Sequence, residues 1–219
     1  MPQKIEEAVS SINSRIKVVS FLGRPRLISG GMLQSGGILE SIWKKGINKL
    51  AKGQFDKRAN CLILGLGGGT LANLINQTFP KAKITAVEID PVMIKLGRRY
   101  FGLDKIPDLE IICADAIEMV ISNPRGLTKS SSEVEELVEY DLIFVDLYLG
   151  DQFPREAETT EFLENIKKLL KNKGWVVFNR LFYGEHKEKA EKFIHRLEKY
   201  FSKIELIRTW SNLLIFSRY

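Results

Sequence analysis

Short apolar runs alternate with amphipathic stretches over most of the chain. From residue 61 onward, five apolar runs fit buried strands, each followed by a stretch with helical spacing of apolar residues. The runs are Cys61 to Leu64, Ile84 to Ile89, Leu109 to Cys113, Asp141 to Val145 and Trp175 to Phe178. This alternation predicts parallel strands joined by helices.

Two further apolar runs, Ile204 to Arg208 and Asn212 to Phe216, lie too close together for a helical crossover. They must therefore pair antiparallel or lie as neighbours joined by a sharp turn. We expect an α/β fold with a doubly wound, mainly parallel seven-stranded sheet and a reversed strand at one edge.

The helices have recognisable ends and faces. Asp90-Pro91 reads as an N-cap acid followed by proline at the first helical position. Two more helices are expected over Thr160 to Lys171 and Lys187 to Phe201. The polar and acidic segment 122–139 reads as a surface insertion.

The N-terminal part follows a different pattern. Ile16 to Phe21 and Arg26 to Leu33 read as short strands, and glycine and proline interrupt them. A helix follows whose buried stripe comprises Leu39, Ile42, Trp43, Ile47 and Leu50, with Trp43 expected as plain core packing. We therefore divide the chain into residues 1–55, a small β-flap with a linking helix, and residues 56–219, a Rossmann-like domain.

Composition narrows the class of protein. A chain of 219 residues with 44% hydrophobic content suffices for one well-cored α/β domain. The formal charge is +6, but basic and acidic residues are interleaved, which favours solvated surfaces over a nucleic-acid partner. No apolar run approaches the ~20 residues that span a bilayer. Cys61 and Cys113 read as free thiols, so we expect a cytoplasmic protein; a homodimer is left open.

The stretch from Cys61 to Asp90 carries the clearest chemistry. A strand runs into a glycine-rich turn, a helix follows, and a second strand ends at Glu88. Such a turn lets backbone approach a ligand, and an acid at the second strand's end accepts from ribose hydroxyls. The third glycine of a dinucleotide fingerprint falls on Thr70, which disfavours a pyrophosphate and suits S-adenosylmethionine. A nicotinamide-linked oxidoreductase is the alternative that this unit leaves open.

Several motifs together resemble the spermidine synthase-like branch of the class I S-adenosylmethionine-dependent methyltransferase superfamily. They are LILGLGGGT, VEIDP, ADA and DLIFVDLYLGD, each at a strand end, and Leu33-Gln34-Ser35-Gly36 before the linking helix. The resemblance covers roughly residues 16–180. It implies S-adenosylmethionine or its decarboxylated form as cofactor, without metal.

The resemblance also implies roles for individual residues. Gly65, Gly67 and Gly69 would face the methionine side of the cofactor, and Glu88, with Ile89 beside it, would hold the ribose. Asp115 would accept from the adenine amino group and Ala116 would offer its backbone N–H. The alternative for Asp115 is a helix N-cap, and both roles are compatible.

Asp146 matches the first acid of the family's D-x-x-D motif, which orients and deprotonates the attacking amine. The alternative is a carboxylate that holds only the cofactor's amino group. Gln34, Tyr148 and Asp151 are expected at the substrate. The second acid of the motif is replaced by Leu149, so that only the shifted Asp151 could serve.

Two further departures concern the aminopropyltransferases. Their glycine turn contains an acid that grips the amine of decarboxylated S-adenosylmethionine, and this chain has Gly68 there. Their diamine-binding cluster is replaced by Trp43-Lys44-Lys45. His186 and His195 receive no role.

We therefore expect a transferase that moves an alkyl group to a small-molecule acceptor such as an amine, with methyl transfer favoured over aminopropyl transfer. The alternatives are an aminopropyltransferase of polyamine synthesis that uses decarboxylated S-adenosylmethionine, and a module that binds the cofactor without catalysis.

Overall fold

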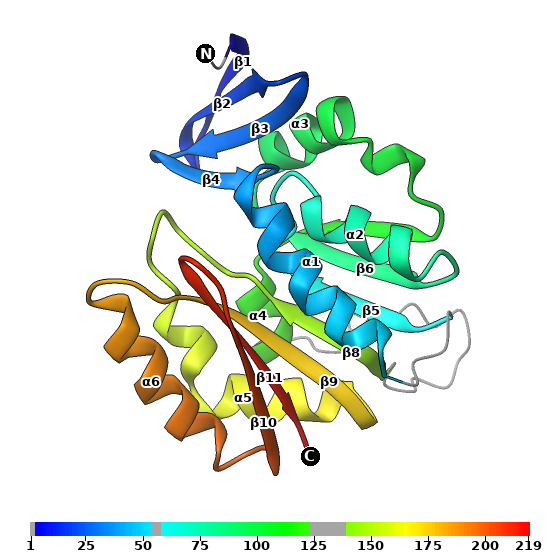
Figure 1. Cartoon of the computed structure of the whole chain (residues 1–219), viewed down its shortest axis with the longest axis vertical. Coiled ribbons are helices and arrows are strands. Elements are labelled where there is room, and N and C mark those ends of the chain that lie inside the picture. The colour runs from blue at the N-terminus through cyan, green and yellow to red at the C-terminus, as the bar shows by residue number, and fades with distance from the viewer. Residues whose placement is uncertain (1–2, 54–57, 123–138) are drawn as a thin grey trace.

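The computed structural model describes residues 3–53, 58–122 and 139–219, which form two β-sheets (Figure 1). The larger sheet has the strand order β10-β11-β9-β8-β5-β6-β7, and the smaller has the order β1-β2-β3-β4. The strands are β1 (Gln3–Ser10), β2 (Ser14–Phe21), β3 (Arg24–Ser29), β4 (Met32–Ser35), β5 (Asn60–Leu64), β6 (Lys83–Glu88), β7 (Leu109–Cys113), β8 (Tyr140–Val145), β9 (Leu170–Leu181), β10 (Lys203–Arg208) and β11 (Asn212–Arg218).

The helices are α1 (Ile38–Ala51), α2 (Thr70–Thr78), α3 (Pro91–Phe101), α4 (Ala116–Ser122), α5 (Thr160–Leu169) and α6 (His186–Leu197), with short 3₁₀ turns η1 (Leu103–Lys105) and η3 (Arg155–Glu158). The segment 122–139, predicted as a surface insertion, lies outside the described residues except for its two ends. Among the described residues, no helix has the length and apolarity needed to cross a lipid bilayer.

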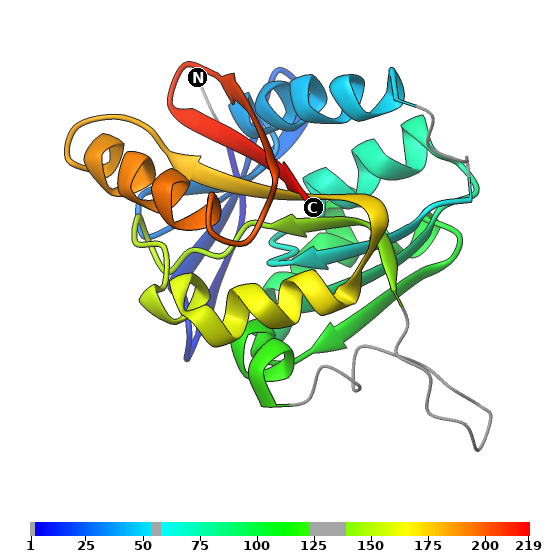
Figure 2. The ribbon, with the colours of Figure 1, turned by 90° about the horizontal axis from the view of Figure 1, so that it is seen from below.

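The central strands of the larger sheet are parallel and buried on both faces. β5 pairs in parallel with β6 and β8, and successive β5 residues point to opposite faces. Ile63 packs in a core with residues of α1 and α2, whereas Leu62 packs with residues of α4, α5 and α6. Figure 2 shows these helices on the two sides of the sheet. The doubly wound sheet predicted from the sequence is therefore confirmed.

The reversed strand is β11, which pairs antiparallel with both β9 and β10. It lies one place inward from the edge, whereas the sequence prediction put the reversed strand at the edge. After α6 the chain forms β10 at the edge of the sheet, one strand position away from β9. The tight turn after Arg208 then places β11 between β10 and β9. The close spacing of the two runs predicted their antiparallel pairing but not which of them lies outside.

The N-terminal sheet contains more strands than the sequence predicted. β1 pairs antiparallel with β2, although its residues alternate poorly and most are exposed or half-buried. It is an edge strand whose conformation comes from this pairing, so a hydrophobic pattern does not reveal it. The inner strands contribute Ile16, Val18 and Leu27 to a core shared with α3.

Asp90 joins this small sheet to the larger one. Its carboxylate accepts from the backbone N–H of Val92 at 2.8 Å, which confirms the predicted N-cap of α3. The other carboxylate oxygen accepts from Ser10 Oγ at 2.5 Å and Asn13 Nδ2 at 2.8 Å. Asp90 is fully buried, and these bonds fix the β1–β2 turn against the carboxyl end of β6.

The linking helix α1 packs on the larger sheet through the predicted apolar stripe. Ile42, Trp43, Ile47 and Leu50 are buried. A Cβ atom at Gly46 would lie 2.8 Å from a methyl carbon of Leu214 on β11, so the helix packs closely on that strand. The division of the chain near residue 55 stays a prediction, since α1 shares its core with the sheet that follows it.

Candidate functional site

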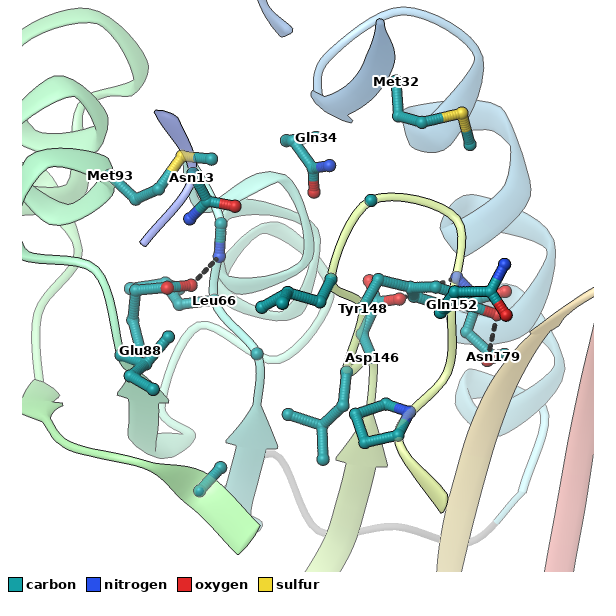
Figure 3. A pocket seen from close by; sticks show the side chains of 18 of the residues that line it. Asn13, Met32, Gln34, Leu66, Glu88, Met93, Asp146, Tyr148, Gln152 and Asn179 are labelled. Atoms are coloured by element: carbon teal, nitrogen blue, oxygen red, sulfur yellow. Dashed lines mark hydrogen bonds between the residues drawn. The ribbon is translucent and has the colours of Figure 1, made fainter. Parts of the chain in front are cut away.

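A cavity of about 530 Å³ opens where the carboxyl ends of the parallel strands meet the small N-terminal sheet (Figure 3). Glu88 lies on one side of it and Asp146 on the other, while Met32 and Gln34 approach from β4. Of the residues expected at the site, those that line the cavity are Gln34, Gly65, Gly67, Glu88, Ile89, Asp115, Ala116, Asp146 and Tyr148. Gly69 and Asp151 lie outside its lining.

The glycine turn is built for close contact between backbone segments. A Cβ atom at Gly65 would lie 2.2 Å from the carbonyl oxygen of Asp146, and one at Gly67 would lie 2.9 Å from the carbonyl oxygen of Gln34. Both residues also have positive φ, which side chains disfavour. The expected approach of a ligand to these glycines stays a prediction; both line the cavity, and their backbone also packs against Asp146, just after β8, and Gln34 of the flap.

Two other positions of the turn have similar packing reasons. A Cβ atom at Gly68 would lie 2.9 Å from both Cβ and Oγ of Ser35, and one at Gly69 would lie 2.2 Å from a methyl group of Leu103. Gly68 therefore stands where the flap touches the turn. An acid at this position, as in the aminopropyltransferase pattern, would require Ser35 to move.

The N–H groups of the turn already have acceptors within the protein. Gly65 N donates to Val87 O, Gly67 N to Glu88 Oε2, Gly68 N to Ser35 Oγ and Gly69 N to Leu66 O, at 2.7 to 3.0 Å. These groups are thus not presented to a phosphate in the manner of a dinucleotide-binding turn. This agrees with the interpretation of Thr70, whose hydroxyl accepts from Gly36 N of the flap.

Glu88 ends β6 and faces the cavity from a buried position. Its two carboxylate oxygens accept from Gly67 N at 2.7 Å and Asp90 N at 3.0 Å. Burial raises the pKa of Glu88 above its usual range, and the two backbone bonds oppose this shift. Each carboxylate oxygen keeps a further lone pair, so the group has capacity for ligand hydroxyls.

Asp115 caps α4 and also borders the cavity. Its Oδ1 accepts from Ile117 N at 2.7 Å and from Glu118 N at 3.3 Å, which is the capping role expected as the alternative. Ala116 and Ile117 line the cavity beside it, with Ile89 and Pro154. Apolar side chains with a carboxylate beside them have the polarity that an adenine ring requires.

Asp146 accepts hydrogen bonds from two side chains that come from different elements. Its Oδ2 accepts from the indole N–H of Trp43 at 3.1 Å, and its Oδ1 accepts from Asn179 Nδ2 at 2.8 Å. Burial raises the pKa of Asp146 to about 6, and the two hydrogen bonds oppose that rise. The carboxylate therefore titrates near the range in which a general base operates.

The loop after β8 is held onto the end of β9. The Tyr148 hydroxyl donates to Asn179 O at 3.1 Å and accepts from Leu181 N at 2.7 Å. Asp151 lies outside the lining and is half-exposed, with Oδ2 at 3.4 Å from Nε2 of His186. The shifted acid of the motif thus pairs with the first residue of α6.

The charges around the cavity have one sign. Its described lining contains the acids Glu88, Asp115, Asp146 and Glu156, and none of the described lining residues is Lys, Arg or His. An acidic cavity favours a cationic ligand such as a sulfonium or an ammonium.

Sequence reasoning missed several residues of the site. Trp43 is buried core, as expected, but its indole N–H also holds Asp146. Asn179 and Asn212 lie on β9 and β11, and Asn13 on the β1–β2 turn. A polar Asn at the end of an apolar strand was a usable signal for Asn179; the others depend on tertiary contacts.

The chain matches the family model described as the spermine/spermidine synthase domain over residues 40–217. It is 33% identical over 143 residues to a polyamine aminopropyltransferase of Chromobacterium violaceum, covering 65% of this chain and 49% of that protein. It is 30% identical over 125 residues to an eEF1A lysine and N-terminal methyltransferase homolog of Drosophila melanogaster, covering 57% of this chain and 18% of that protein. The chain thus spans less than half of these relatives.

Solved structures show the same fold. A probable spermidine synthase from Corynebacterium glutamicum superposes with a TM-score of 0.77 at 17% identity, covering 100% of this chain and 80% of that one. Human methyltransferase-like protein 13, in complex with SAH, superposes with a TM-score of 0.62 at 22% identity, covering 83% and 79%. Both the fold and the family predicted from the sequence are confirmed: the chain belongs to the spermine/spermidine synthase family.

Proposed function

We propose that the protein is an S-adenosylmethionine-dependent transferase that moves a methyl group to a small-molecule amine. The observation that carries this proposal is the placement of Asp146, a half-buried carboxylate with a raised pKa, across the cavity from the ribose-type acid Glu88. Relatives in the family are methyltransferases or aminopropyltransferases. The relatives and the cavity both support a transferase that moves an alkyl group.

The donor would occupy the cavity with its adenosine end toward Glu88. The ribose hydroxyls would donate to Glu88, and the adenine ring would lie in the slot formed by Ile89, Ala116 and Ile117 with Asp115 near its amino group. The sulfonium would then lie near Gly65 and Asp146, since the turn and the end of β8 are adjacent. The acidic lining stabilises this positive charge.

At the acceptor end, Asp146 would hold the amine and take its proton. The nitrogen lone pair attacks the methyl carbon, the carbon–sulfur bond breaks, and its electron pair returns to sulfur as a neutral thioether. The proton released by the amine passes to the Asp146 carboxylate. Catalysis then rests on positioning and on exclusion of water from a cavity with apolar walls.

The acceptor end suits an amine with a single charge and an apolar body. Tyr148, Asn179 and Asn212 line the cavity together with Asp146 and bring neutral polar groups, and apolar walls come from Ile38, Leu39, Leu149 and Leu181. In the family's D-x-x-D motif a second acid is expected for the distal ammonium of a diamine, and here the shifted Asp151 lies outside the lining beside His186.

Aminopropyl transfer from the decarboxylated donor is the second candidate, and one observation favours it. The carboxylate of S-adenosylmethionine finds no cationic side chain among the described lining residues, and the N–H groups of Gly65, Gly67, Gly68 and Gly69 already have acceptors. The contact of Gly68 with Ser35 opposes this candidate, because it leaves no room for the acid that grips the donor amine.

The test is a turnover assay with each donor against a panel of monoamines, diamines and polyamines, with products identified by mass spectrometry. We expect a mass increase of one methyl group on a monoamine with S-adenosylmethionine. Transfer of an aminopropyl group would select the second candidate. Donor binding without any product would favour the non-catalytic module and overturn the proposal.

A further inference from the structure

A chain of side-chain hydrogen bonds leads from the rim of the cavity to Asp146. Ser211 Oγ donates to Asn212 Oδ1 at 2.6 Å, Asn212 Nδ2 donates to Asn179 Oδ1 at 2.9 Å, and Asn179 Nδ2 donates to Asp146 Oδ1 at 2.8 Å. All four residues line the cavity. Every bond points the same way, with its donor on the Ser211 side and its acceptor on the Asp146 side.

The direction of the chain fixes the amide of Asn179. Its oxygen is occupied by the N–H of Asn212, so only its NH₂ group can face Asp146. Asn179 and Asn212 are both buried, which makes an unpaired amide costly and holds the arrangement in place. Aligned hydrogen bonds also polarise one another, so the final donor is stronger than an isolated amide.

We propose that Asn179 and Asn212 are positioning residues that keep the Asp146 carboxylate ionised and oriented toward the acceptor. The inference rests on the proposed function for its purpose, while the electrostatic effect follows from the geometry alone. It also gives the reversed strand β11 a part in the site, because Asn212 begins that strand.

Apart from Asn179, one other described side chain donates to Asp146, and no described charge of opposite sign faces it. Trp43 contributes one more neutral donor from α1. Tyr148, on the loop after β8, has a pKa raised by burial and stays neutral at physiological pH. Glu88 faces the same cavity from β6 and carries the same charge as Asp146. No described cationic residue lines the cavity, so hydrogen-bond donors are what stabilises the Asp146 charge against burial.

The test is a direct titration of Asp146 in the whole chain by carbon-13 NMR of labelled aspartate carboxyl groups. The Asp146 signal is identified by its absence in Asp146→Asn. We expect a midpoint near 6 in the wild type. In Asn179→Leu the midpoint should rise by about one unit or more, because the carboxylate loses its nearest amide donor.

Asn212→Leu tests whether the series of hydrogen bonds matters beyond the single bond from Asn179 to Asp146, since Asn212 does not touch Asp146. Its midpoint should rise in the same direction by a fraction of a unit, because Asn179 loses the bond that fixes and polarises it. Asn165→Leu is the matched control: its amide donates to the backbone oxygens of Val120 and Ile121, away from the cavity. Its midpoint should equal that of the wild type.

An unchanged midpoint in folded Asn179→Leu would overturn the proposal. If the Asp146 midpoint rises in Asn179→Leu but not in Asn212→Leu, the proposed role of Asn212 is overturned. Should Asn179→Leu fail to fold, Asn212→Leu alone decides. Because the titration uses neither donor nor acceptor, its outcome is independent of the turnover assay that tests the proposed function.

Discussion

Replacing Asp146 with Asn tests the chemistry of the site most sharply. The substitution keeps the side-chain shape but removes the group that would take the amine proton. We expect turnover to fall by roughly 10² to 10⁴, the usual range for a lost acid–base group, which corresponds to about 3 to 5 kcal/mol of barrier. The assay is turnover at saturating donor with the best acceptor of the amine panel.

A second effect of this variant concerns stability and pH. Because burial raises the pKa of Asp146 to about 6, the folded protein holds this proton more tightly than the unfolded chain. The group therefore stabilises the protonated fold, and this contribution is lost as the pH rises from about 4 to about 6, by roughly 3 kcal/mol in total. Denaturant unfolding of Asp146→Asn should lack this decline.

Exchanging the carboxylate and the amide between positions 146 and 179 tests whether the carboxylate must stand at position 146. In the double variant Asp146→Asn with Asn179→Asp, the new carboxylate can accept from the amide at 146 and from Asn212, while the amide oxygen at 146 accepts from Trp43. Turnover should stay low, because the base has moved to β9. Full turnover in folded Asp146→Asn, or recovery in the double variant, would refute the assignment. A loss of donor affinity that saturating donor restores would instead indicate the cofactor-holding role.

Three other variants test the packing of the site. Gly65→Ala should lower the free energy of unfolding by roughly 1 to 3 kcal/mol or more, since its Cβ would meet the Asp146 carbonyl, and unaltered denaturant unfolding would contradict that contact. Gly68→Asp should not raise the calorimetric affinity for decarboxylated S-adenosylmethionine, because Ser35 occupies the space; a tighter complex would show that the flap yields. Trp43→Phe should move the acid limb of the pH–rate profile to higher pH, because Asp146 loses an N–H donor; an unmoved limb would argue that this bond is dispensable.

The sequence predicted the larger sheet well because its signals are local. Apolar runs of strand length, the Asp90-Pro91 helix start and the glycine turn each depend on a few neighbouring residues, and all appear in the structure. β1 has no such signal, since its polar residues form a strand only by pairing with β2. The start of β9 at Leu170 was missed for a similar reason: its first residues are separated from Trp175 by a register shift against β8.

The acids of the site were predictable because they lie at strand ends. Glu88, Asp115 and Asp146 each follow an apolar run, and the topology brings them to one cavity. The partners of Asp146 come from α1 and β9, far apart in the sequence, so no motif joins them. The glycines were recognised, but their contacts with Asp146 after β8 and with the flap are tertiary, so a sequence pattern does not reveal them.

Calorimetric titration of S-adenosylmethionine into the wild type and Glu88→Ala tests the central claim most directly, with the exposed Glu118→Ala on α4 as the control. Glu88→Ala also removes the acceptor of Gly67 N and Asp90 N, so its fold is first checked by thermal unfolding. The account predicts one donor site per chain in the wild type and the control, and an affinity about 10- to 100-fold weaker in Glu88→Ala, the effect of losing charged hydrogen bonds to the ribose. Equal affinity in folded Glu88→Ala, or no binding of either form of the donor to the wild type, would contradict it.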